Sequence, residues 1–150
     1  MSAYRDRDAF ASLVNALSAS SEFAEVAFPS PLDSSPIGAD RSPLAVLVPT
    51  QWLEQPDSAS SLMLRRVSFT LTLVVRCEDP RERFEILDRL TSIVQNAIEG
   101  STLGGGCLAG MTHLRKGRYD PASRHPELRL ALDGGFCYTI PSATGHASAR

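Results

Sequence analysis

Long apolar runs are missing from this sequence. No segment approaches the roughly 20 apolar residues that a membrane-spanning helix requires, and Met1–Arg7 lacks the basic segment and apolar stretch of a signal peptide. Cysteine is scarce, with three residues and no CxxC spacing, so we expect reduced thiols, although one disulfide pair stays open. These absences lead us to expect a protein made in a cytoplasm, with no membrane partner.

Lysine and a strong net charge are also missing. Lys116 is the only lysine, and the formal net charge is -2 at pH 7. Without a basic field over the whole chain, we expect no specific binding of nucleic acid. The one local positive cluster is His113–Tyr119. We interpret it as a solvated or partner-facing end of a strand.

Motifs for catalysis and for metal binding are absent as well. There is no GxSxG elbow, no HxxxH or CxxC pair, and no GxxxxGK[ST] loop around Gly104–Gly106. A metal site built from Cys107, His113 and Cys137 is conceivable, but scattered surface and core residues are the simpler interpretation. We therefore predict no enzyme active site, no cofactor and no metal.

The length and composition are those of one soluble domain. With 150 residues, 43% of them hydrophobic and 21% charged, the chain can bury one core but is too short for two domains. We expect residues 1–140 to form a single domain. Residues 141–150 are rich in Ser and Ala, and we expect them to form a flexible C-terminal tail.

Helical periodicity predicts two helices. Over residues 4–18 the apolar side chains recur on one side of a helix. The second helix is predicted from Asp79, which can cap it, through Pro80 at its first position to Ile98, with Gly100 ending it.

Period-two alternation predicts a long strand over residues 64–76, with one face toward the core and a hydroxyl-bearing face that suits solvent or a partner sheet. Weaker strand patterns cover residues 22–28, 44–48 and 107–118. Residues 128–140 alternate on both sides of Gly134-Gly135. They predict either one long strand with a glycine bend or a hairpin that turns at the glycines.

Two segments between these elements bear on function. Pro29–Pro43 contains four prolines, so it must be an irregular loop, and a loop of this length is usually functional or disordered. Trp52 is predicted to lie in the core, with a role in an interface as the alternative. The order of elements predicts an α+β fold: a mixed, largely antiparallel sheet with two helices packed on one face.

Three segments resemble the tail terminator and minor tail proteins of long-tailed bacteriophages. They are Arg66–Arg76, then Asp79–Arg81 with Leu87–Leu90, and finally His125–Glu127 leading to Gly135–Ile140. The opening helix fits as well, so the resemblance extends from about Tyr4 to Pro141. Similar parts occur in gene transfer agents and prophage-like particles.

The resemblance implies a structural virion protein without enzymatic activity. Such a protein forms a homo-oligomeric, usually hexameric, ring at the head-proximal end of the tail tube, where it ends tube polymerisation and offers the head-joining surface. Its partners would be the tail tube protein and the head–tail connector or other neck proteins. DNA would pass through the lumen, and the virion would assemble in the host bacterial cytoplasm. Our candidate contact residues are Arg115, Lys116, Arg118, Pro36 and Gly104.

Two other functions remain open. The chain could be another neck protein, such as a head–tail connector or a tail-completion protein. It could also be a small-ligand-binding or enzymatic α+β domain with a pocket beneath the Pro29–Pro43 loop, which would need Tyr119, His125 and Cys137 to converge.

Overall fold

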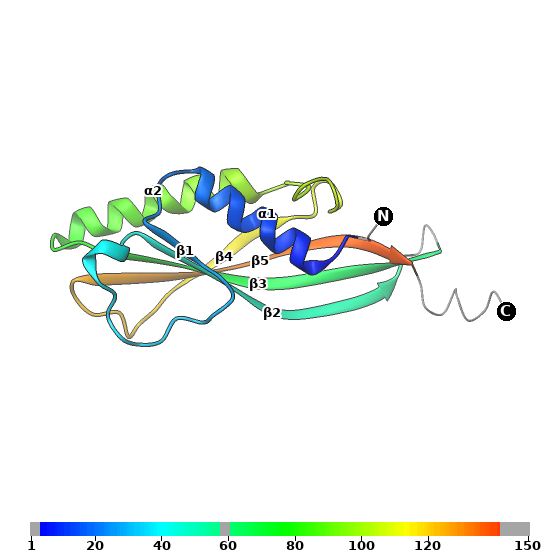
Figure 1. Cartoon of the computed structure of the whole chain (residues 1–150). Helices are drawn as coiled ribbons and strands as arrows, with labels where there is room; N and C mark the ends of the chain where they lie inside the picture. The colour runs from blue at the N-terminus through cyan, green and yellow to red at the C-terminus, as the bar shows by residue number, and fades with distance from the viewer. Residues whose placement is uncertain (1–3, 58–60, 142–150) are drawn as a thin grey trace.

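The computed structural model describes residues 4–57 and 61–141 as a five-stranded sheet with two helices on one of its faces (Figure 1). The elements are α1 (Asp6–Ala19), β1 (Glu25–Ala27), a 3-10 turn (Ala39–Arg41), β2 (Leu44–Pro56), β3 (Leu62–Arg76), α2 (Pro80–Ile98), β4 (His113–Tyr119) and β5 (Glu127–Pro141). The strand order is β1-β2-β3-β5-β4. Only the β1–β2 pair is parallel, which confirms the predicted α+β class.

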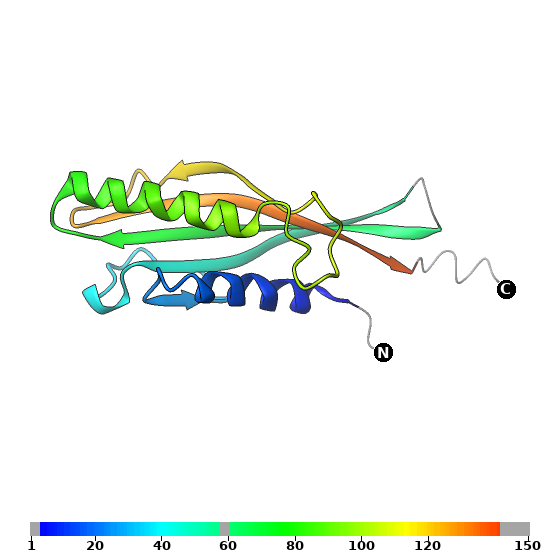
Figure 2. The ribbon, with the colours of Figure 1, turned by 90° about the horizontal axis from the view of Figure 1, so that it is seen from above.

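Helix α2 forms where its capping residues predict it. The Asp79 carboxylate accepts hydrogen bonds from the backbone N–H groups of Arg81 at 3.0 Å and Glu82 at 3.5 Å, and Pro80 occupies the first turn. Gly100, just past the end, has a φ of +75°. Both helices run along the strands when the molecule is viewed from above (Figure 2), and their apolar sides face the sheet.

Strand β3 is the centre of the core. Its helix-facing side chains are buried, whereas the opposite side presents half-buried hydroxyl groups at Ser68, Thr70 and Thr72. This is the two-faced pattern that the alternation predicts. The helix-facing set consists of Val67, Phe69, Leu71, Leu73 and Val75.

Strand β5 is one continuous strand, so the hairpin alternative at Gly134-Gly135 is wrong. It pairs with β3 from Leu62↔Pro141 to Arg76↔Glu127 without interruption. A β-carbon at Gly134 would lie 2.6 Å from the ring of Phe69 and 2.6 Å from the carbonyl oxygen of His113. The glycine is therefore required by close packing and does not mark a turn.

The structure corrects three sequence predictions. Strand β2 continues through Pro49 to Pro56, with a bulge between Pro49 and Gln51; proline is tolerated there because this part of β2 is an edge. Trp52 is 59% exposed and not in the core, because it lies on the edge strand β2 in the part that β1 does not cover. The strand expected over residues 107–118 is limited to β4, since turns occupy much of 103–110.

Other boundaries shift less. The strand predicted over residues 22–28 is limited to the three residues of β1. The predicted flexible tail lies outside the described residues except for Pro141, which belongs to β5. No helix in the described part of the chain is long and apolar enough to cross a membrane.

Replacing Gly134 with Ala should destabilise the protein by about 1–3 kcal/mol, because the added methyl group overlaps Phe69 and the neighbouring strand. Urea denaturation measures the change. Gly117→Ala is the matched control, since its new β-carbon would come closest to the side-chain ends of Leu132 and Leu130, at 3.1 and 3.3 Å, and the nearest backbone atom of the facing strand, the Ala131 oxygen, is 4.0 Å away. Equal losses for the two variants would contradict this explanation.

Candidate assembly surface

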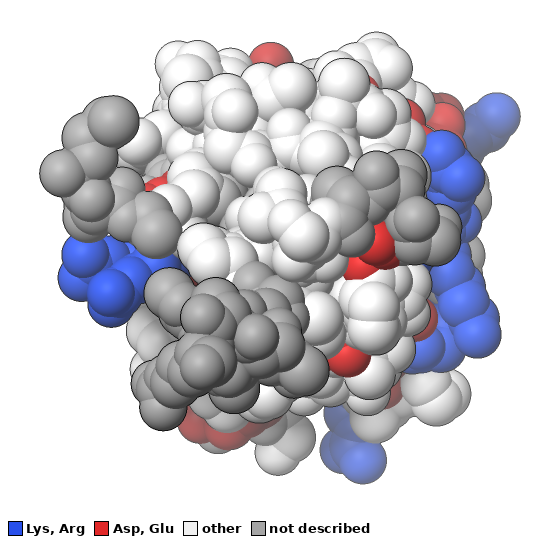
Figure 3. All heavy atoms as spheres, turned by 90° about the vertical axis from the view of Figure 1, so that its right-hand side faces the viewer, with Lys and Arg blue, Asp and Glu red and all other residues white. Residues whose placement is uncertain are grey.

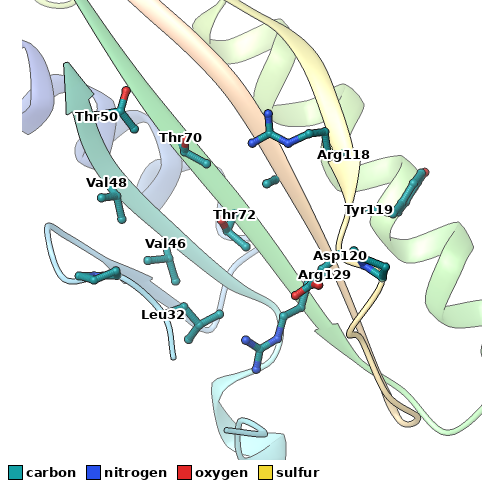
Figure 4. Close-up of a pocket in the computed structure, with 13 residues that line it drawn as sticks. Leu32, Val46, Val48, Thr50, Thr70, Thr72, Arg118, Tyr119, Asp120 and Arg129 are labelled. Atoms are coloured by element: carbon teal, nitrogen blue, oxygen red, sulfur yellow. The ribbon is translucent and has the colours of Figure 1, made fainter. Parts of the chain in front are cut away.

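The sheet face opposite the helices carries a groove beside the Pro29–Pro43 loop (Figure 4). The groove has a volume of about 500 Å³. Its floor is formed by Val46 and Val48 of β2 and by Thr70 and Thr72 of β3, and Arg118 borders it on the β4 side. The surface is thus apolar and hydroxyl-bearing, which suits contact with another protein.

The Pro29–Pro43 loop is fixed to the sheet by buried charged side chains. Arg129 of β5 donates hydrogen bonds to the carbonyl oxygens of Asp33 at 2.6 Å and Ser35 at 2.7 Å. Glu127 pairs with Arg129 at 3.0 Å and accepts a hydrogen bond from the backbone of Ile37. Arg129 and Glu127 are only 8% and 6% exposed, and such charges are stable when buried only if they are paired and hydrogen-bonded. The loop therefore has a defined shape.

Two of the three predicted basic contact residues already have partners within the chain. Arg115 bonds to Glu99 at 2.7 Å and Arg118 to Asp133 at 2.7 Å, whereas Lys116 is exposed. Burial opposes ionisation of Glu99, but the Leu114 N–H and the Arg115 guanidinium outweigh it and lower its pKa. The positive cluster is thus weaker than the sequence suggests. Lys116 and Arg118 extend from the groove side of β4.

The other predicted contact residues lie elsewhere. Pro36 is in the loop and lines a second hollow of about 390 Å³ that also contains His125. Gly104, with a φ of +85°, turns the chain against α1, where a β-carbon would lie 3.0 Å from the Ser12 hydroxyl oxygen. The five predicted residues therefore do not form one surface.

The three residues needed for the ligand-binding alternative do not converge. Tyr119 stacks on Phe84 of α2, and His125 bonds to Glu78 at 3.2 Å. Cys137 is buried in β5 seven positions from Leu130, the partner of Tyr119; that is about 23 Å along a strand. Within residues 4–57 and 61–141, no group of three or more His, Cys, Asp or Glu residues could hold a metal ion.

A second charged cluster joins α1 to the projecting end of the sheet. Arg65 of β3 bonds to Asp6 at 2.6 Å and to Glu54 at 2.6 Å, and its guanidinium lies 4.3 Å from the centre of the Trp52 ring. Tyr138 donates a hydrogen bond to Asp6. The hydrogen bond from Arg65 is the main reason that the pKa of Asp6 is lowered.

Sequence reasoning missed both charged clusters. Glu127 and Arg129 appear as the polar members of an alternating strand, and Arg65 is 59 residues from Asp6. A usable signal was the Glu127–Arg129 pair itself, since an acid and a base two residues apart share one face of a strand.

Seen from the end where β2, β3 and β5 project, most of the described surface is uncharged, with Lys and Arg toward the sides (Figure 3).

Comparison with known proteins supports the fold. No protein-family model matches the sequence, and no curated protein matches it. Among solved structures, a chain of the virion of a native gene transfer agent particle is similar, with a TM-score of 0.57 and 15% sequence identity. The match covers 83% of this chain and 84% of that chain. At this identity the likeness concerns the fold.

Replacing Arg129 with Leu should destabilise the protein by about 3–5 kcal/mol, because it leaves the Glu127 carboxylate buried without its cation. Removing both charges in an Arg129→Leu, Glu127→Leu double variant should cost less than the single change. Urea denaturation gives the energies, and amide exchange over residues 33–37 reports loosening of the loop. A single variant with wild-type stability and exchange would contradict the anchoring role.

Asp6→Asn should cost about 1–3 kcal/mol at pH 7, because it removes the charge that Arg65 and Tyr138 bind. Since the pKa of Asp6 is lower in the folded chain, its contribution is complete above its ordinary pKa and is lost as the pH falls through the folded-state value. The difference from wild type should therefore shrink in acid. Urea denaturation at neutral and acidic pH tests this, with the exposed Asp88→Asn as control. A difference that does not depend on pH would argue against an ionic role.

Proposed function

We propose that this chain is a structural virion protein of the phage type that forms a ring, hexameric as in the proteins it resembles, at the head-proximal end of a tail tube. The observation that carries the proposal is the fold it shares with a chain of the gene transfer agent virion over 83% of its length. The resemblance of Arg66–Arg76, Asp79–Arg81 and Gly135–Ile140 to tail terminator segments points the same way.

The proposed mechanism is the matching of surfaces, with no bond made or broken. One rim of the ring binds the last ring of the tail tube protein and so stops further polymerisation. The other rim offers the surface for the head–tail connector or other neck proteins. The groove and its firmly held loop supply a surface of defined shape for such contacts, and Lys116 and Arg118 border that side. The lumen leaves room for the passage of DNA.

A place elsewhere in the neck is the second candidate, because several kinds of neck protein are small and ring-forming. A head–tail connector would bind the portal side, whereas a terminator binds the end of the tube. The ligand-binding alternative has a groove in the expected place beneath the loop, but its three polar residues lie apart. We do not propose it.

The test adds the purified protein to tail tubes polymerising from the matching tube protein. We expect the protein at one end of each tube in negative-stain electron microscopy, and tubes whose length stops increasing after the addition. An unrelated small α+β protein at the same concentration is the control. Tubes that grow unchanged and carry no added density would contradict the terminator role, and binding to portal rings instead would favour the connector.

A further inference from the structure

In the described part of the chain, the sheet has two lateral edges that pair with no further strand over most of their length. Strand β1 covers only Leu44–Val46 of β2, and no other strand of the described residues pairs with the outer side of residues 47–56. Strand β4 has no outer neighbouring strand in the same part of the chain, although the N–H and C=O of Leu114 at its start are bonded to the side chains of Glu99 and Gln95. Unpaired N–H and C=O groups along a strand are a template for a further strand.

Exposed aromatic side chains flank both edges on the helix side of the sheet. At the β2 edge, Phe28 stacks on Phe10 of α1, and Trp52 lies on the same side as buried Val67. At the β4 edge, Tyr119 stacks on Phe84 of α2 with ring centroids 6.1 Å apart. All the aromatic residues among the exposed large hydrophobic side chains of the described chain belong to these two groups; they are Phe28, Trp52, Phe84 and Tyr119, each at least 39% exposed.

Trp52 is held in place before any partner binds. Its ring lies 4.3 Å from the guanidinium carbon of Arg65, and Arg65 is fixed by Asp6 and Glu54. A large aromatic side chain that loses little freedom on binding makes a strong interface anchor, and Trp and Arg are enriched at such positions.

We propose that the β2 edge of one copy of this chain binds the β4 edge of a second copy, which continues the sheet and brings Trp52 against Tyr119 and Phe84. Strands β2, β3, β5 and β4 are antiparallel at each step, so β2 and β4 run in opposite directions. Two copies in the same orientation therefore place β2 antiparallel to the neighbour's β4. Tyr119 lies level with Ala45 of its own sheet, so the neighbour is displaced along the strands by seven residues, about 23 Å, to bring Tyr119 to Trp52 and clear of β1. A head-to-tail contact of this kind uses two different patches and can close into a ring.

The charges at the two edges favour this pairing over the contact of like edges. Strand β4 carries Arg115, Lys116 and Arg118 and no acidic residue, whereas residues 47–56 of β2 carry Glu54 and no basic residue. A β4–β4 contact would place like charges together, which is unfavourable. Arg115, Arg118 and Glu54 are already paired within the chain with Glu99, Asp133 and Arg65. The exposed Lys116 is therefore the charge that disfavours a β4–β4 contact, whereas a β2–β4 contact brings no second basic residue to it. The inference rests on the ring of the proposed function but identifies its subunit contact.

Sedimentation velocity of the full chain, at concentrations up to about 1 mM, tests the contact. We expect the wild-type chain to self-associate and the Trp52→Ala and Tyr119→Ala variants to do so at least about 30-fold more weakly, as for interface anchors. Leu32→Ala, on the opposite face of the sheet and at neither edge, is the matched control and should associate as wild type does. Circular dichroism confirms that each variant is folded.

Mixing the variants gives the sharper result. Trp52→Ala keeps an intact β4 edge and Tyr119→Ala an intact β2 edge, so an equimolar mixture should form heterodimers and nothing larger. If Tyr119→Ala fails to fold, Lys116→Glu replaces it, since it alters the same edge. This exposed change puts an acid on the β4 edge and should weaken association about tenfold or more.

Two outcomes would overturn the inference: a wild-type chain that stays monomeric at about 1 mM, or edge variants that associate as strongly as wild type. Failure of this inference is distinguishable from failure of the proposed function. If the edge variants still cap tail tubes in complete rings, the proposed subunit contact is wrong and the proposed function stands. If the chain self-associates through these edges but leaves tubes uncapped, the proposed position on the tail is wrong and the subunit contact stands.

Discussion

The pairing of β3 with β5 is the interaction on which the rest of the structure depends. It extends over all fifteen residues of β3 and places the buried face of both strands beneath the two helices. It also carries Arg129 and Glu127 to the loop at one end and Tyr138 to the Arg65 cluster at the other. A shift of one residue in this register would turn each of these side chains to the opposite face.

Local chemistry made part of this structure predictable. The alternation over residues 64–76 and the Asp79-Pro80 start of α2 are signals within a few residues of one another, and both elements form as predicted. The continuity of β2 through Pro49 and the exposure of Trp52 were not predictable in this way. They depend on which strand lies at the edge of the sheet and on how little of that strand β1 covers.

The candidate site was less predictable than the fold because long-range pairs build it. Arg129 meets Ser35 94 residues earlier in the chain, and Arg65 meets Asp6 across 59 residues. A sequence pattern shows that such residues are charged but not that they are buried or joined. Conversely, the basic cluster around Lys116 was conspicuous in the sequence, yet two of its arginines are neutralised by Glu99 and Asp133.

The two unusual surfaces fit different contacts of one assembly part. The lateral edges fit neighbouring copies, and the groove with its anchored loop is left free for other proteins of the particle. The most direct test of the central claim is to locate this chain by cryo-electron microscopy in an intact particle that contains it. We expect a closed ring of copies between the tail tube and the neck. A single copy at another place, or a particle without the chain, would contradict the account.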